Sequence, residues 1–76
     1  MNKSQKIEGL RDRLRNAFIA SGKTAEQVRR ETGISKSSFY THLNGEPMGP
    51  LYLARYCVAL NVSADWLLGL KEEARR

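Results

Sequence analysis

Residues 24–45 read TAEQVRRETGISKSSFYTHLNG and contain two short amphipathic segments that meet at Gly33. Thr24 is followed three residues later by Gln27, a capping-box pattern that predicts a helix beginning at Ala25. Gly33 is expected to end this helix, because glycine adopts the left-handed conformation at a helix C-terminus without steric cost. The stretch therefore predicts a helix, a tight turn and a second helix.

The second helix is predicted to begin after a capping Ser35, with Phe39 and Leu43 facing inward and Asn44-Gly45 closing it. This arrangement leaves a row of polar side chains facing outward: Ser35, Lys36, Ser37, Tyr40, Thr41 and Asn44. Residues 32–45 contain no carboxylate. Because an α-helix fits the major groove of DNA and short polar side chains reach base edges and phosphates there, the pattern favours binding to double-stranded DNA.

The rest of the chain predicts three more helices and no strand. Apolar residues recur every three or four positions from Ile7 to Phe18, and Ser21-Gly22 ends that stretch. Pro50 suits the first turn of a further helix, and Ser63 caps a short last one. We therefore expect an all-α, five-helix fold.

Composition limits the possible functions. The 76 residues suit one domain, expected to span 1–76 with 71–76 as a frayed or helical tail or the start of a linker. No apolar stretch approaches the ~20 residues that cross a bilayer. The single Cys57 cannot form an internal disulfide, which fits a reducing cytoplasm. Thirteen basic against eight acidic residues give a net charge of +5, which favours a polyanionic partner.

An enzyme is the least favoured class. The chain has one His and one Cys, and neither a Gly-rich phosphate loop nor a Cys/His metal set. We therefore expect no catalytic residue, no metal, no cofactor and no small-molecule ligand.

The run from Thr24 to Gly45 resembles the helix-turn-helix of the phage Cro and CI repressor family, the xenobiotic-response-element-like group of bacterial regulators. The segment ALNVSADWLLG at 59–69 matches the family's junction between its fourth and fifth helices. The resemblance covers residues 7–70 and implies a lambda-repressor-like five-helix domain. The matching residues of the motif are Thr24, Val28, Gly33-Ile34-Ser35, Phe39 and Asn44-Gly45.

Three positions depart from the family pattern. Ala25 stands where a phosphate-contacting Gln is usual. Arg29 replaces a small residue at the helix crossing, so its stem is expected to lie along the helix pair while the guanidinium reaches solvent or phosphate. His42 replaces an aliphatic core residue and is expected to be a half-buried imidazole in a polar niche rather than a base contact.

Roles can be assigned from position on the second helix, because its N-terminal residues reach base edges and later ones meet the backbone. The expected base contacts are Ser35, Lys36, Ser37, Tyr40 and Thr41. The expected phosphate contacts are Lys23, Arg29, Arg30 and Asn44, the last together with N–H groups near Gly45. Four other arginines fit solvated surface positions equally well: Arg11, Arg13, Arg15 and Arg55.

The resulting hypothesis is a transcriptional regulator of phage or prophage type that binds a palindromic operator as a homodimer, in the cytoplasm of a bacterium or a phage-infected host. Leu68 and Leu70 are the expected dimer contacts, both taken to be exposed. The alternative is an antitoxin that binds a protein partner, with DNA binding secondary. Only Met1–Lys6 and Lys71–Arg76 are spare for such a partner, which counts against it. The sequence leaves open whether a further domain follows.

Overall fold

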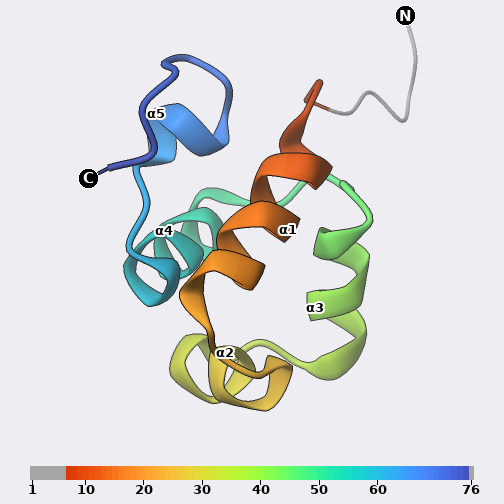
Figure 1. Cartoon of the computed structure of the whole chain (residues 1–76). Helices are drawn as coiled ribbons and strands as arrows, with labels where there is room; N and C mark the ends of the chain where they lie inside the picture. Colours follow the sequence, from red (N-terminus) through yellow and green to blue (C-terminus); the bar gives the residue numbers. More distant parts are fainter. Residues whose placement is uncertain (1–6, 76) are drawn as a thin grey trace, which may run out of the picture.

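A computed structural model describes residues 7–75, which form five α-helices and no strand. The fold is therefore the all-α, five-helix arrangement predicted from the sequence. Figure 1 labels the helices, whose bounds are α1 Leu10–Ser21, α2 Ala25–Thr32, α3 Lys36–Leu43, α4 Pro50–Leu60 and α5 Ala64–Leu67. None of them has both the length and the apolar character that a bilayer-spanning helix needs.

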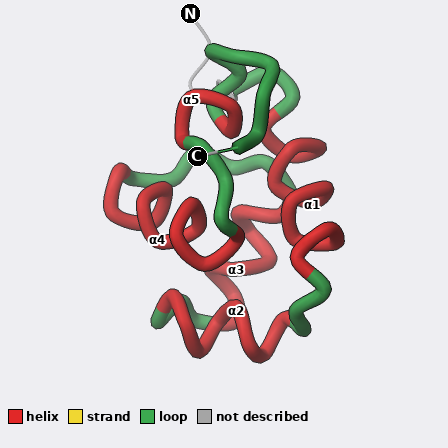
Figure 2. The backbone as a smooth tube through the Cα atoms, turned by 60° about the vertical axis from the view of Figure 1, so that its left-hand side comes forward, coloured by secondary structure: helices red, strands yellow, loops and turns green. Residues whose placement is uncertain are grey.

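Helices α1 and α4 organise the packing. Helix α1 contacts α3, α4 and α5, and α4 also contacts α2 and α5. Figures 1 and 2 show α2 at one end of the molecule and α5 at the other. The two helices of the helix-turn-helix therefore rest on different supports, α2 on α4 and α3 on α1.

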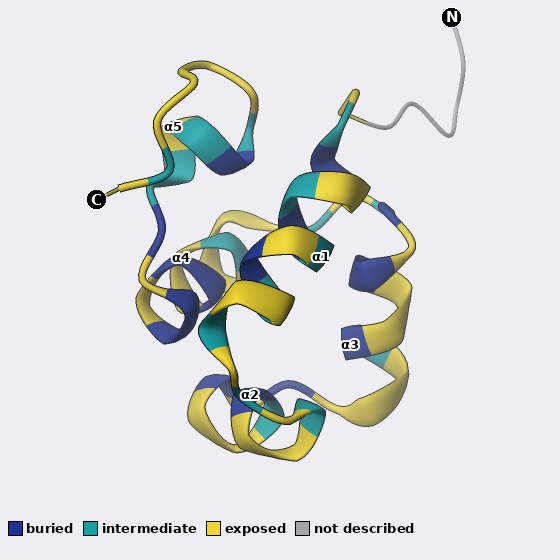
Figure 3. Cartoon of the chain, in the orientation of Figure 1, coloured by how far each residue is buried: buried dark blue, intermediate teal, exposed yellow. Residues whose placement is uncertain are grey.

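The apolar core forms where the helices meet. Each helix contributes buried residues on one side, and together with two connecting residues they form a single cluster: Leu10, Leu14, Ala17, Val28, Ile34, Phe39, Leu43, Tyr56, Cys57, Leu60, Val62 and Leu67. The Phe39 ring meets the Phe18 ring edge-on, with centroids 5.5 Å apart, and it lies 6.4 Å from the Tyr56 ring. Figure 3 shows the buried side of α3 turned toward α1 and its exposed side turned outward.

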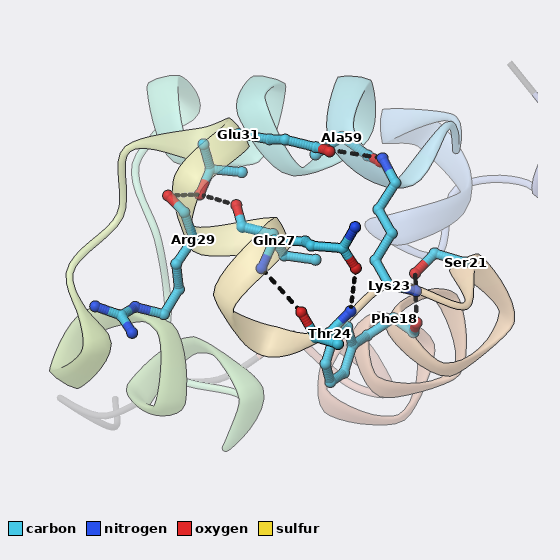
Figure 4. A network of polar contacts seen from close by, with 10 residues as sticks. Phe18, Ser21, Lys23, Thr24, Gln27, Arg29, Glu31 and Ala59 are labelled. Carbon is cyan, nitrogen blue, oxygen red and sulfur yellow. Dashed lines mark hydrogen bonds and ion pairs between the residues drawn. The ribbon is translucent and has the colours of Figure 1, made fainter.

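Local capping signals position the starts of α2 and α3, as predicted. The Thr24 hydroxyl accepts from the Gln27 N–H at 3.1 Å, and the Gln27 side chain accepts from the Thr24 N–H at 2.8 Å (Figure 4). Ser35 accepts from the Ser38 N–H at 3.3 Å, and so begins α3. One expectation needs correction. Because α1 begins only at Leu10, after a Gly9 in the left-handed conformation, Ile7 is 41% exposed and lies outside the apolar stripe.

The C-terminal segment also differs from the prediction. Residues 71–75 form neither a helix nor a frayed end but a coil that folds back beside α5, as Figure 2 shows. The Ser63 N–H donates to the Ala74 carbonyl at 2.7 Å, and Ala74 packs against the core. Residue 76 lies outside the described residues, as do 1–6.

The ends of four helices depend on contacts that the sequence did not reveal. In each last turn a carbonyl accepts a hydrogen bond from a cationic side chain of another element, which offsets the partial negative charge at the helix C-terminus. The four contacts are Arg55 Nη1 to Thr32 O at 3.1 Å, Arg15 Nε to Leu43 O at 2.8 Å, Lys23 Nζ to Ala59 O at 2.8 Å, and Arg13 Nε to Leu67 O at 2.9 Å. Part of the basic charge is therefore structural.

The turn of the helix-turn-helix gives a first test. Gly33 has φ +73°, and a Cβ there would have Arg55 Nη1 at 3.5 Å as its nearest neighbour, which is ordinary contact. Gly33→Ala is therefore expected to lower the free energy of unfolding by about 1–2 kcal/mol through backbone conformation alone. Gly33→Asn should lower it less, because asparagine tolerates this conformation better. Urea unfolding of the three proteins measures the difference, and equal losses would contradict the explanation.

Candidate nucleic-acid interface

The predicted base-contact residues lie together on the outer face of α3 and at its N-terminal cap. All of them are exposed, and Figure 3 shows this side of α3 turned away from the rest of the chain. Helix α3 contains no acidic residue. The set is Ser35, Lys36, Ser37, Tyr40 and Thr41.

Hydrogen bonds within α3 decide what two of these hydroxyls can offer a partner. Ser35 Oγ accepts from the Ser38 N–H, so its own proton is free to be donated outward. Thr41 Oγ1 donates to the Ser37 carbonyl at 2.8 Å. Thr41 therefore offers acceptor lone pairs and a methyl group, which suit an exocyclic amino group or a thymine methyl rather than an acceptor atom.

The predicted phosphate residues on α2 have different environments. Arg30 is exposed. Arg29 is only partly exposed, and the Nε of its guanidinium is buried without a hydrogen-bond partner among the described residues. In Figure 4 its side chain extends away from the capping contacts at the start of α2. A shallow pocket runs beside it, lined by Glu26, Arg29, Arg30 and Ile34.

Lys23 has a different setting from the one that the sequence suggested. Its ammonium lies 2.7 Å from the Glu31 carboxylate and 2.8 Å from the Ala59 carbonyl, where it links α2 to the end of α4 (Figure 4). A phosphate contact would require this ammonium to leave both partners. The structure therefore does not bring Lys23 to the face that carries the base-contact residues.

The end of α3 carries the remaining predicted phosphate contact. Asn44 is exposed, and its Oδ1 accepts from Arg15 Nη2 at 3.2 Å. The backbone N–H groups expected to help it are engaged within the turn: Asn44 N to Tyr40 O and Thr41 O, Gly45 N to His42 O, and Glu46 N to Thr41 O. At the C-terminal end of α3, only side chains are therefore available to bind a ligand. Sequence reasoning missed Arg15, because its partners follow 28 and 29 residues later.

His42 fills a polar niche between α3 and α4, as predicted, and is buried more fully than expected, with 6% of its surface exposed. Its Nδ1 lies 2.8 Å from the Tyr56 hydroxyl, and its ring packs beside Tyr52. Burial lowers the pKa of His42 below its ordinary value. Burial, followed by the nearby Tyr52, raises the pKa of Tyr56 well above its usual range. The neutral pair therefore joins the inner side of α3 to α4.

The two leucines proposed for a dimer contact differ in exposure. Leu70 is 73% exposed, whereas Leu68 is partly buried, because it ends α5 beside the rest of the domain. Other large apolar side chains are exposed elsewhere, and sequence reasoning did not identify them: Ile19, Leu51 and Val58.

No group of three or more His, Cys, Asp or Glu side chains able to hold a metal ion occurs within residues 7–75. An apolar surface groove lies between α2 and α4, lined by Glu31, Ala54, Arg55, Val58 and Ala59. None of the residues predicted to contact DNA lines this groove.

Comparison with known proteins bears on the same segment. A family model described as a Cro/C1-type HTH DNA-binding domain matches residues 13–73. No curated protein and no solved structure matches the chain significantly. The matched residues include most of α1 and all of α2 to α5, so they cover the outer face of α3 and the helices that support it.

The buried His42 predicts a pH effect on stability. Since its pKa in the folded protein lies below the ordinary 6.5, the folded state binds a proton less readily than the unfolded state. The contribution of His42 to the free energy of unfolding is fully present above pH 6.5 and falls as the pH drops toward the folded-state pKa. His42→Gln removes the titration and serves as the reference. Between pH 7.5 and pH 5.5, the free energy of unfolding measured in urea should fall more in the natural protein than in His42→Gln. An equal fall in the two proteins would contradict this prediction.

Proposed function

The chain belongs to the Cro/C1-type helix-turn-helix DNA-binding family, and from this premise we propose that it is a sequence-specific transcriptional regulator with α3 in the DNA major groove. The observation that carries the proposal is the outer face of α3, which is polar, exposed and free of acidic residues. A buried inner face holds the same helix on the core. Such a helix can enter the groove without rearrangement of the domain.

The residues near the start of α3 are proposed to read bases. Lys36 can donate to guanine O6 and N7, and Ser37 lies beside it on the first turn. Thr41, one turn later, accepts from an amino group or contacts a thymine methyl. The Tyr40 ring packs against Phe39 at 5.3 Å while remaining 46% exposed, so it can contact a thymine methyl, a sugar or a phosphate.

Phosphates are proposed to be held on both sides of α3. Arg29 and Arg30 lie on α2, the helix that crosses the DNA backbone in this architecture. Asn44 lies at the opposite end of α3. Lys23 belongs to the set only if DNA displaces it from Glu31, which makes it the weakest of the four.

We further propose that the protein acts as a repressor of phage or prophage type on a palindromic operator. One recognition helix reads only a few base pairs, so useful specificity requires two copies about 34 Å apart. The exposed Leu70 is the better candidate for the dimer contact, with the partly buried Leu68 beside it. A dimer that neutralises about eight phosphates gives a slope of log K against log salt near −7. This role requires access to DNA in the cytoplasm.

Selection from a random-sequence duplex pool at physiological salt tests this function directly. The expected product is a two-fold symmetric sequence whose half-sites are about 10 base pairs apart, centre to centre. Sedimentation of the protein alone and on the selected duplex then gives the stoichiometry. Failure to enrich any sequence would overturn the proposal, and enrichment of a single asymmetric site bound by one protomer would overturn the dimer.

Two substitutions distinguish a base contact from a phosphate contact. Lys36→Ala should weaken binding to the selected duplex by about 1–3 kcal/mol and relax the preference at one position of each half-site. Arg30→Ala should weaken all duplexes alike and reduce the magnitude of the salt slope by about one per protomer. Lys71→Ala removes the same charge from the exposed C-terminal coil and is the matched control. Equal effects of all three on affinity would mean that charge alone drives binding.

A further inference from the structure

We propose that Arg15 of α1 is a positioning residue of the DNA interface, which turns the C-terminal end of α3 into a phosphate-binding end by orienting Asn44. This inference rests on the proposed function. The Arg15 guanidinium contacts two consecutive residues, with Nε on the Leu43 carbonyl at 2.8 Å and Nη2 on Asn44 Oδ1 at 3.2 Å. A planar group with two fixed donors holds both acceptors in one geometry, which a single flexible amine does not.

The contact determines which way the Asn44 amide faces. A guanidinium only donates hydrogen bonds, so the oxygen of the amide must face Arg15. The NH2 group then occupies the other branch of an exposed side chain and points away from Arg15. An NH2 group donates, and a phosphate oxygen accepts. The orientation imposed by Arg15 is therefore the one that binds phosphate.

For electrostatic reasons, a phosphate at the C-terminal end of α3 needs this contribution from Arg15. The C-terminus of a helix carries partial negative charge and repels an anion. The N–H groups of Asn44, Gly45 and Glu46 already donate to carbonyls of α3, so the backbone cannot receive a phosphate here. The charge of Arg15, placed on the last carbonyl of α3, offsets the unfavourable potential.

Arg13 offers an internal control, because it lies two residues away on α1 and makes a similar contact. Its Nε donates to the Leu67 carbonyl at the end of α5 at 2.9 Å, and its Nη2 donates to the Glu8 carbonyl at 2.8 Å. Both acceptors are backbone groups, and no predicted DNA-contact residue is among them. Loss of Arg13 therefore removes a helix-end cap without changing the proposed phosphate contact.

The test is a double-mutant cycle on the selected duplex with Arg15→Met, Asn44→Ala and both together. Each single substitution should weaken binding about tenfold, since a charge-assisted hydrogen bond contributes about that much. The double variant should bind about as weakly as either single one, because Arg15 acts through Asn44. If the losses of affinity from the two single substitutions multiply in the double variant, Arg15 acts independently of Asn44, which would overturn the positioning role. Arg13→Met should lower the melting temperature without weakening the binding of one protomer to a duplex with a single half-site, where the dimer contacts beside the end of α5 do not contribute. An equal loss of affinity on that duplex would reduce Arg15 to a structural cap.

Arg15→Lys distinguishes orientation from charge. Lysine keeps the positive charge but cannot hold both acceptors, so affinity should stay well below that of the natural protein. If Arg15→Lys binds the selected duplex as tightly as the natural protein does, the inference is overturned. In the free protein, NMR should detect a slowly exchanging Arg15 Nε–H, and its absence would also contradict the geometry. If the natural protein binds no duplex while this N–H is protected, the proposed function fails and the contact is only a helix cap.

Discussion

The last carbonyl groups of a helix have no hydrogen-bond donor within that helix. The need to supply donors from elsewhere governs this domain of short helices more than any other constraint. Helices α2 and α3 have eight residues each and α5 has four, so none is stable without its neighbours. Cationic side chains from other elements reach the last turns of these helices and of α4. The helices are thus tied to one another at their ends as well as through the apolar core. This is why removing a surface arginine can affect a helix far away in the sequence.

The same contacts change the meaning of the net charge. A charge of +5 on 76 residues favours a polyanionic partner, but several of the cations have structural duties. Arg13 and Arg55 cap α5 and α2, and Lys23 links α2 to α4. The DNA-binding role consequently depends on fewer charges than the composition suggests. Lys36 and Arg30, which are exposed, are the cations that we propose for it.

Helix α3 shows how packing and recognition share one short element. Phe39, His42 and Leu43 are buried on one side, and the polar residues proposed to read DNA lie on the other. The hydrogen bond between His42 and Tyr56 fixes the rotation of α3 against α4, since a displaced imidazole would leave two buried polar groups unpaired. A rigid inner face gives the outer side chains a defined register, which sequence-specific contact requires.

Sequence by itself determined the elements whose signals are local. The reciprocal contacts of Thr24 and Gln27, the left-handed Gly33 and the apolar period of α3 each act within one or two helical turns, so a pattern in the chain is enough to predict them. Only the tertiary structure decided the contacts of Arg15, the setting of Lys23 and the folded-back coil at 71–75. These depend on which helix ends lie beside which side chains after packing. No local pattern contains that information, because their partners lie 8 to 36 residues away.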